Sequence, residues 1–314
     1  MQALKNWLAT TKFSEYTLEV ASADASFRQY YRLSKDTYTY IVMDASQEKA
    51  SLVPFVDVTK RLLDVGVHAP QIVAQNIEAG YLILEDLGSR QLLDVLQEEN
   101  QLALYSLALE EILKMQHAEA SGLPLYDKAF LHVEMDLMKT WFLEQYVALE
   151  LSREDEVTIA ESLEAISAEV LAQPQGYFVH RDFHSRNIMV GEDAVLGVID
   201  YQDAMRGAVT YDLVSLLRDL YIALPSELVT QLVLAFRDIV AADVDDKTFI
   251  RWFDFMGLQR HIKVLGIFSR LYLRDGKDGY LKDLPLTLQY TCDVAQKYRE
   301  TQKLSALLEK IELP

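Results

Sequence analysis

Cysteine is nearly absent from this chain of 314 residues, in which Cys292 stands alone. A single cysteine cannot form an internal disulfide, so the chain is not a disulfide-stabilised secreted scaffold. Glycine and proline are few, at 12 and 7 residues, and the sequence contains no internal repeat or low-complexity stretch. These shortages exclude fibrous, repeat and disordered architectures and leave a globular protein.

Long hydrophobic runs are missing as well. A membrane helix needs about 20 consecutive apolar residues, whereas the best candidate, residues 228–236, is bounded by Glu227 and Arg237. The first residues, MQALKNWLATTKFSEY, lack the apolar core of a secretory signal peptide. We therefore expect no membrane association and a cytoplasmic location.

Basic residues are outnumbered, because 30 Lys and Arg stand against 48 Asp and Glu, and the formal net charge is −18. Nucleic acids are bound through clustered Lys and Arg, so a general nucleic-acid partner is excluded. Half of the residues are apolar and 25% are charged, as in ordinary globular proteins. At this length one large domain or two domains are expected.

Hydrophobic patterning divides the chain into a strand-rich part and a helical part. The first part predicts strands at residues 17–21, 26–33, 37–43 and 80–85 around one helix at 51–65, which Gly66 ends. The rest predicts helices at 101–117, 134–149, 152–171 and from 211 onward, with short strands at 177–179, 188–190 and 195–199. This order predicts an α+β fold.

A polar segment in the middle of the chain carries the clearest chemical signal. The run HRDFHSRN covers His180 to Asn187, and Asp200 follows Asn187 by thirteen residues. Asp182 can accept the proton of a hydroxyl nucleophile, while Asn187 and Asp200 offer the oxygen ligands that Mg²⁺ prefers. If a loop and a hairpin bring the three together, the segment suits phosphoryl transfer from a nucleotide.

These residues resemble the protein-kinase-like superfamily and, within it, the aminoglycoside phosphotransferase family. The pattern H-x-D-x-x-x-x-N is filled by His180, Asp182 and Asn187, and Asp200 stands where the D-F-G motif has its magnesium ligand. ASADASFRQYYRL, YIVMDA, LILEDLG and TYDLVSLLRD extend the resemblance over most of the chain. It implies a bilobal fold. Residues 1–87 would form a nucleotide-binding lobe with a small antiparallel sheet and one helix, and residues 88–314 a mainly helical lobe with the catalytic loop and substrate site.

The longer sequence stretches around these motifs are similar to those of a subgroup of sugar kinases that act in cell-wall recycling. This resemblance implies ATP and Mg²⁺ as cofactors and phosphorylation of the anomeric hydroxyl of N-acetylmuramate or N-acetylglucosamine, with Asp182 as the catalytic base. Two alternatives stay open: a kinase for aminoglycosides or other amino alcohols, whose positive charge would suit an acidic protein, and a nucleotide-binding pseudokinase. The sequence does not predict an oligomeric state.

The expected nucleotide site departs from that of protein kinases at two points. The loop over the phosphates, residues 21–28, contains no glycine, and we expect Ser26 to offer hydrogen bonds there and Phe27 to shield the phosphates. Met43 occupies the place of the phosphate-binding lysine. Arg28, Arg32 and Lys49 are the nearby cations that could replace it, since an Arg can bind phosphate oxygens in pairs. The backbone from Glu85 to Leu87 is the predicted hinge that binds adenine.

The predicted substrate-binding residues lie close to the catalytic segment. His184 could act as a cation near the γ-phosphate, bind a sugar oxygen or pack within the loop. Arg186 or Arg206 could receive the carboxylate of muramate. Asp203 belongs to the same predicted set, although salt bridges among these groups would equally explain them. Asp212 is expected to support the loop.

Overall fold

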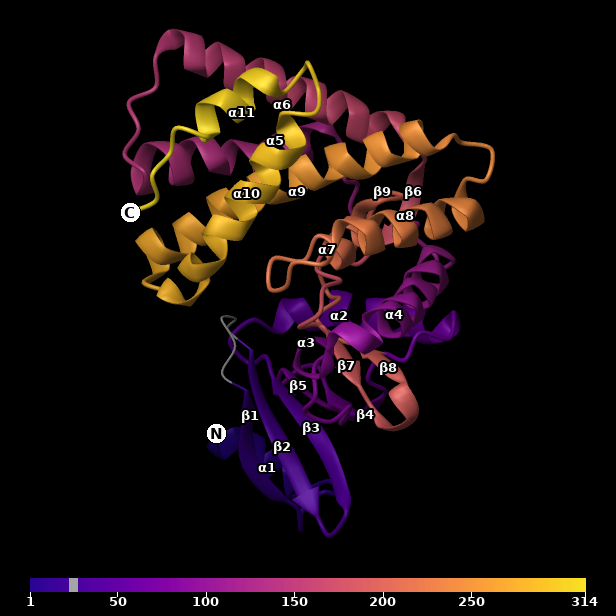
Figure 1. Ribbon diagram of the computed structural model, residues 1–314. Coiled ribbons are helices and arrows are strands. Elements are labelled where there is room, and N and C mark those ends of the chain that lie inside the picture. Colours follow the sequence, from indigo (N-terminus) through magenta and orange to yellow (C-terminus); the bar gives the residue numbers. More distant parts are fainter. Residues whose placement is uncertain (23–27) are drawn as a thin grey trace.

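The computed structural model describes residues 1–22 and 28–314, and Figure 1 shows a strand-rich lobe joined to a larger helical lobe. This arrangement confirms the predicted α+β bilobal fold. Ser26 and Phe27 lie outside the described residues, so the predictions for them stay predictions.

The strand-rich lobe contains a five-stranded antiparallel sheet of order β1-β2-β3-β5-β4. Successive side chains of a strand point to opposite faces, and here each face has its own apolar cluster. Met43 and its partner Leu82 belong to one cluster, whereas Val42 and its partner Ile83 belong to the other. The strands are β1 Thr17–Ser22, β2 Gln29–Lys35, β3 Tyr38–Asp44, β4 Ile72–Asn76 and β5 Tyr81–Glu85.

Two helices supply the apolar partners of these faces. Helix α2 (Leu52–Asp64) contributes Phe55, Val58 and Leu62 to the cluster that contains Met43. Helix α1 (Gln2–Leu8) contributes Leu4 and Leu8 to the other cluster. The sequence predicted α2 but not α1, and it also missed β4, whose residues are only partly buried and show no clear alternation.

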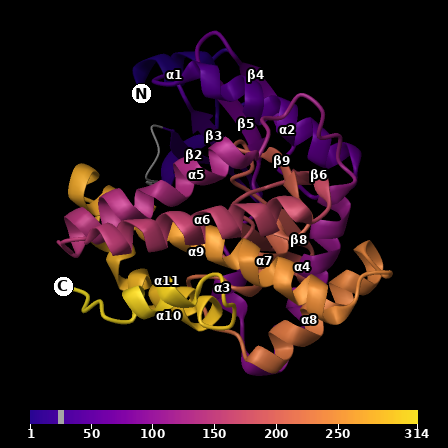
Figure 2. The same cartoon turned by 90° about the horizontal axis from the view of Figure 1, so that it is seen from above.

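The helical lobe is built around α9 (Asp246–Asp275), a helix of 30 residues that packs against α5, α6, α7, α8 and α10. Figure 2 shows α5, α6 and α9 side by side. The other helices are α3 Leu92–Val95, α4 Gln101–Gln116, α5 Lys128–Leu137 with a π-helical continuation at Met138–Tyr146, α6 Arg153–Ala172, α7 Tyr211–Leu217, α8 Ser226–Val240, α10 Leu284–Ala295 and α11 Gln302–Leu308.

The helix predicted at 134–149 begins six residues earlier, at Lys128. The Asp127 side chain accepts a hydrogen bond from the Phe130 amide and caps the first turn. The predicted start was wrong because Asp127 and the first residues of the helix, Lys128 and Ala129, are exposed and give no hydrophobic signal.

Two short antiparallel strand pairs complete the structure: in Figure 1 β7 and β8 lie near the strand-rich lobe, whereas β6 and β9 lie within the helical lobe. Strand β6 (Gln175–Val179) pairs with β9 (Met205–Ala208), and β7 (Ile188–Val190) pairs with β8 (Leu196–Val198). Strand β9 was not predicted. In the described part of the chain no helix is long and apolar enough to cross a membrane.

Candidate active site

The two predicted metal ligands are brought together by the β7–β8 hairpin. Asn187 directly precedes β7, Asp200 closely follows β8, and Ile188 pairs with Val198. The Ile199 amide donates to the Asn187 carbonyl at 3.1 Å, and Asn187 Nδ2 lies 3.4 Å from Asp200 Oδ2. The antiparallel register therefore converts a separation of thirteen residues into direct contact, as the sequence predicted.

Asp182 joins this pair through the main chain of the loop. Asn187 Nδ2 donates to the Asp182 carbonyl at 2.9 Å. Arg181 and Asp200 both have left-handed backbones, with φ of 79° and 65°. Such conformations cost a non-glycine residue on the order of 1 kcal/mol. The surrounding contacts therefore hold two strained residues close to Asp182 and Asn187.

Two buried carboxylates stabilise the loop that contains Asp182 by accepting hydrogen bonds from its backbone amides. Asp212 accepts hydrogen bonds from the amides of His180 at 2.8 Å and Arg181 at 3.0 Å, and burial raises its pKa to about 6. Asp219 accepts from the Ser185 amide at 2.8 Å. The supporting role expected for Asp212 agrees with these contacts, whereas the similar role of Asp219 was not predicted.

The residue after Asp200 connects the loop to the strand-rich lobe. Tyr201 is buried, its ring stacks on Phe55 of α2 with a centroid distance of 5.1 Å, and its hydroxyl lies 2.8 Å from Thr59 Oγ1. Its ring also meets the His180 ring edge to face. A displacement of α2 would therefore also move Tyr201, the residue next to Asp200.

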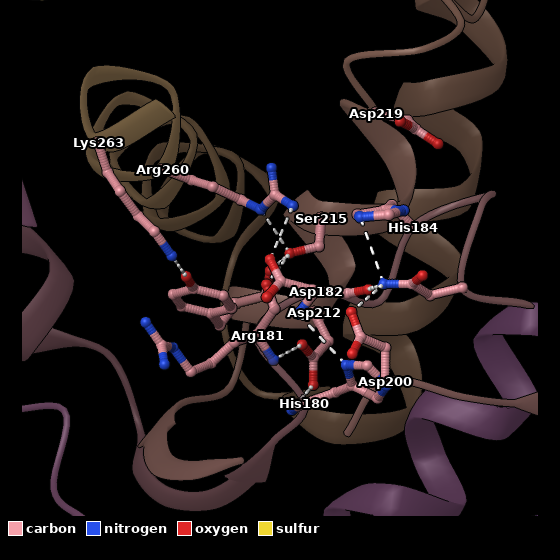
Figure 3. A network of polar contacts seen from close by, with 12 residues as sticks. His180, Arg181, Asp182, His184, Asp200, Asp212, Ser215, Asp219, Arg260 and Lys263 are labelled. Carbon is pink, nitrogen blue, oxygen red and sulfur yellow. Dashed lines mark hydrogen bonds and ion pairs between the residues drawn. The ribbon is translucent and has the colours of Figure 1, made fainter. Parts of the chain in front are cut away.

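The charge of Asp182 is controlled by cations from distant elements (Figure 3). Burial disfavours the charged form, but the field of Lys263, Arg260 and other cations outweighs burial and holds the pKa of Asp182 well below its usual range. Arg260 Nη2 lies 3.9 Å from Asp182 Oδ1. Asp182 is therefore an ionised acceptor at neutral pH, with a side chain that is still 43% exposed.

A buried charge network lies behind this carboxylate. Glu134 Oε1 accepts from Arg181 at 2.6 Å and lies 3.3 Å from Lys263 Nζ. Glu134 Oε2 accepts from the Tyr126 hydroxyl and from Gln259 Nε2. The sequence analysis missed this network, although the polar residues Gln259, Arg260, His261 and Lys263 follow one another closely in the middle of a long helix and were an available signal.

His184 lies next to the catalytic loop residues but is not a cation. Burial lowers its pKa to about 4, although Asp219 and Asp182 oppose the shift. Its Nε2 lies 3.4 Å from Asn187 Nδ2, and its Nδ1 has no hydrogen-bond partner among the described residues. The expectation of a positive imidazole near the phosphate is therefore not supported at neutral pH. Hydrogen bonding to a sugar oxygen stays a prediction, and the contacts with Asn187 and Tyr221 agree equally with packing within the loop.

The other predicted substrate residues are more dispersed. The Arg186 guanidinium lies over the Tyr221 ring at 3.8 Å, beside the ring of His184, which packs edge to face on the same tyrosine. Arg206 lies in β9 opposite Phe178, and Asp203 is exposed and accepts a weak hydrogen bond from Gln202. Within residues 1–22 and 28–314, neither Arg186 nor Arg206 forms a salt bridge with an acid.

Of the three cations proposed to replace the missing lysine, two have partners elsewhere. Arg32 forms an ion pair with Asp86, at 2.7 Å from Nε to Oδ2, and Lys49 Nζ donates to the Glu78 carbonyl. Arg28 is buried, and its Nε donates to Ser51 Oγ at 3.3 Å, just before α2 begins. It directly precedes Gln29, which pairs with Asp44, so Arg28 lies at the end of β3 that contains Met43. Met43 itself is fully buried.

The predicted hinge lies at the end of β5. The Glu85 side chain pairs with His68, at 2.9 Å between Oε1 and Nε2, so its contact with a nucleotide would go through the main chain. Leu87 packs closely over β8, where a Cβ on Gly197 would lie only 2.7 Å from Leu87 Cδ1. Glycine at this position allows the connector between the lobes to lie directly on the hairpin that carries Asn187 and Asp200.

The donor chemistry fits a metal that is shared with a ligand. Asn187 and Asp200 provide an amide and a carboxylate, and the described residues contain no group of three or more His, Cys, Asp or Glu arranged to hold a metal. Mg²⁺ commonly takes one or two protein ligands and completes its shell with phosphates and water. The pair therefore suits a metal that arrives with a nucleotide.

A five-stranded lobe, a helical lobe and this loop between them define the class of kinase-like phosphotransferases. The chain belongs to the phosphotransferase enzyme family, whose sequence model matches residues 17–251.

Comparison with characterised proteins gives similar chains of nearly equal length. The sequence is 39% identical to an N-acetylmuramate/N-acetylglucosamine kinase of Neisseria meningitidis serogroup B, over 98% of this chain and 95% of the relative. A Pseudomonas aeruginosa protein of the same name is 37% identical over 93% of this chain and 87% of its own.

Solved structures show the same fold at low sequence identity. An ADP-bound aminoglycoside phosphotransferase superposes with a TM-score of 0.66 at 17% identity, covering 93% of this chain and 98% of that one. A choline kinase of Streptococcus pneumoniae gives a TM-score of 0.65 at 13% identity, with the same coverage.

Proposed function

We propose that this protein transfers the γ-phosphoryl group of ATP to the anomeric hydroxyl of N-acetylmuramate or N-acetylglucosamine. The observation that carries the reaction is the meeting of Asp182, Asn187 and Asp200 within one loop and hairpin. The relatives in Neisseria and Pseudomonas support the choice of sugar. Because the reaction consumes ATP, we also propose the cytoplasm as its location.

Asp182 would orient the sugar hydroxyl and accept its proton. A carboxylate of depressed pKa is a weak base, so it fits a reaction in which the proton leaves late and positioning supplies most of the rate. The partly exposed side chain of Asp182 and the strained backbone of Arg181 beside it support this role.

Asn187 and Asp200 would hold Mg²⁺, and the metal when bound neutralises negative charge on the phosphates. The neutral Asn places an oxygen ligand beside Asp182 and Asp200 without adding a third negative charge. On the nucleotide side we propose that Arg28 replaces the missing lysine, that Ser26 and Phe27 cover the phosphates, and that the main chain from Glu85 to Leu87 binds adenine. Residues 1–87 would then be the nucleotide-binding lobe and 88–314 the lobe that binds sugar.

For the sugar we propose contacts from the side of the helical lobe. Neutral His184 would exchange a hydrogen bond with a sugar oxygen, and Arg186 or Arg206 would receive the lactyl carboxylate of muramate, with Asp203 accepting from a hydroxyl. The stacking of Arg186 on Tyr221 supports its choice, because a stacked guanidinium keeps its edge available for a carboxylate.

A coupled ATPase screen tests the function. It compares N-acetylmuramate, N-acetylglucosamine, choline and kanamycin, with mass detection of the product and its stability in mild acid. We expect turnover of the two amino sugars and an acid-labile product, since anomeric phosphates hydrolyse readily. Phosphorylation of kanamycin alone would support the aminoglycoside alternative, and absence of turnover with every acceptor would support a nucleotide-binding protein without catalysis.

Two substitutions separate the roles of the carboxylates. Asp182→Asn should lower kcat by roughly 10²- to 10⁴-fold because the proton acceptor is lost. Asp200→Asn should raise the Mg²⁺ concentration required for half-maximal rate. Asp193→Asn is the matched control, since Asp193 is exposed in the turn between β7 and β8 and its left-handed backbone suits Asn. An Asp182→Asn variant with the parent rate would refute the assigned base.

A further inference from the structure

Arg260 is a buried cation with unused hydrogen-bonding capacity. It projects from α9, and its side chain is only 4% exposed. Its Nε donates to Ser215 Oγ at 2.7 Å and its Nη2 lies 3.9 Å from Asp182 Oδ1. Its Nη1 is buried and has no hydrogen-bond partner among the described residues.

An unpartnered buried donor requires an explanation. Leaving such a group unsatisfied costs about 1 to 3 kcal/mol, and native proteins do so rarely. Lys263, on the same helix, differs because it has both Glu134 and the Tyr211 hydroxyl as partners. Arg260 is therefore the cation nearest Asp182 that is well placed to receive a further acceptor.

The position of Arg260 indicates which ligand would supply that acceptor. In Figure 3, Arg260 and Asp200 lie on opposite sides of Asp182. A metal and phosphates held at Asp200 would occupy one side, so Arg260 faces the side left for the molecule whose hydroxyl Asp182 orients. Both terminal nitrogens of a guanidinium are bonded to one carbon, so an oxygen bound by Nη1 must lie close to the reacting hydroxyl.

We propose that Arg260 both positions Asp182 through Nη2 and selects the acceptor sugar through Nη1, which donates to an oxygen of the group carried by the carbon next to the one that bears the reacting hydroxyl. This inference rests on the proposed sugar kinase function. In N-acetylated amino sugars phosphorylated at the anomeric position, that oxygen is the acetamido carbonyl. Glucosamine presents an ammonium group there, which cannot accept a hydrogen bond and is repelled by the guanidinium.

The test measures kcat and KM for N-acetylglucosamine and glucosamine with the wild type, Arg260→Met and Arg260→Lys. In Arg260→Met, kcat should fall for both sugars because Asp182 loses its neighbouring cation. KM should rise for N-acetylglucosamine alone. The ratio of the two kcat/KM values should fall by roughly tenfold or more, the effect expected for one lost hydrogen bond from a charged donor.

Arg251→Met is the matched control. Arg251 lies on the same helix, nine residues earlier and so roughly 13 Å away along the axis, and it pairs with Glu169 and Glu300. Its substitution should leave the ratio unchanged. ADP affinity and melting temperature report on folding. If Arg260→Met is unfolded, Arg260→Lys serves as the test. Lysine retains the positive charge but lacks the two terminal nitrogens of the guanidinium. We therefore expect kcat to recover largely, while the ratio of the two kcat/KM values still falls.

The possible results are distinct. An active wild type whose sugar ratio is unchanged in both Arg260 variants overturns this inference and leaves the proposed function standing. A fall in kcat without a change in the ratio also overturns it, because Arg260 would then only position Asp182. A wild type that phosphorylates no sugar overturns the proposed function and this inference together.

Discussion

Replacing Glu134 by Gln would remove the carboxylate that Arg181 and Lys263 share. The side chains of Glu134 and Lys263 are 7% and 6% exposed, so water cannot take the place of the lost charge. The new amide could still accept hydrogen bonds, but it would leave both cations buried without a counterion between them. Of the charged groups near them, Asp182 would then be the principal negative charge.

The expected loss is large. Breaking a buried ion pair by removing one partner costs about 3 to 5 kcal/mol, because the remaining charge stays desolvated. A typical domain has a free energy of unfolding of about 5 to 15 kcal/mol. Glu134→Gln should therefore remove a substantial part of the stability. Lys263→Met in the same background removes one of the two cations, so the double variant should be less destabilised than the sum of the single variants.

The effect also has a defined pH dependence. Burial opposes ionisation of Glu134, but Lys263 and Arg181 outweigh it and keep the pKa below its ordinary value of 4.5. A depressed carboxyl pKa contributes stability that is present above the unfolded-state pKa and is lost as pH falls through the folded-state pKa. The difference between the parent and Glu134→Gln should thus be complete at pH 7 and shrink below pH 4.5.

Urea unfolding of the parent, both single variants and the double variant measures the coupling free energy. We expect a coupling of about 1 to 3 kcal/mol at pH 7. Lys139→Met with Glu144→Gln is the control pair, since these side chains are 33% and 39% exposed and such surface pairs contribute about 0 to 1 kcal/mol. Additive effects of Glu134→Gln and Lys263→Met would refute the reasoning.

Two further substitutions test how the loop and its supporting helix are held. Gly266→Ala would place a Cβ 2.3 Å from the main-chain carbon of Leu137. It should therefore lower the melting temperature by an amount equivalent to about 1 to 3 kcal/mol, whereas Gly279→Ala, with nothing within 4 Å, should not. In Asp212→Asn a single side-chain oxygen would face two backbone amides. The free energy of unfolding in urea should therefore fall by about 1 to 3 kcal/mol, and kcat should fall as well. An unchanged kcat would contradict the supporting role of Asp212.

The meeting of the proposed metal ligands was predictable because its geometry is local. Asn187 and Asp200 flank a tight hairpin, and strand pairing alone brings them together. The fold class, the strand-rich first part and most helices also followed from periodicity. Helix α1 and strand β4 were not predicted because each is short, and β4 shows no clear alternation of apolar and polar residues.

Other residues of the site could not be found in this way. Arg260 and Lys263 appear in the sequence as ordinary polar residues of a helix, and Glu134 as one acid among many. In the chain Arg181 lies 47 positions and Lys263 129 positions from Glu134, and Arg260 lies 78 positions from Asp182. The neutral state of His184 likewise depends on burial, which no local pattern encodes.

The amino-acid sequence by itself determined which residues meet at the β7–β8 hairpin and the order of the two lobes, because these depend on residue type and short-range pairing. Only the tertiary structure decided which cations surround Asp182. That choice depends on how closely α9 packs against α5 and α7, and Gly266 permits the close approach to Leu137 at the end of α5. Desolvation in the resulting interior then sets the charge of each group, and no linear pattern specifies it.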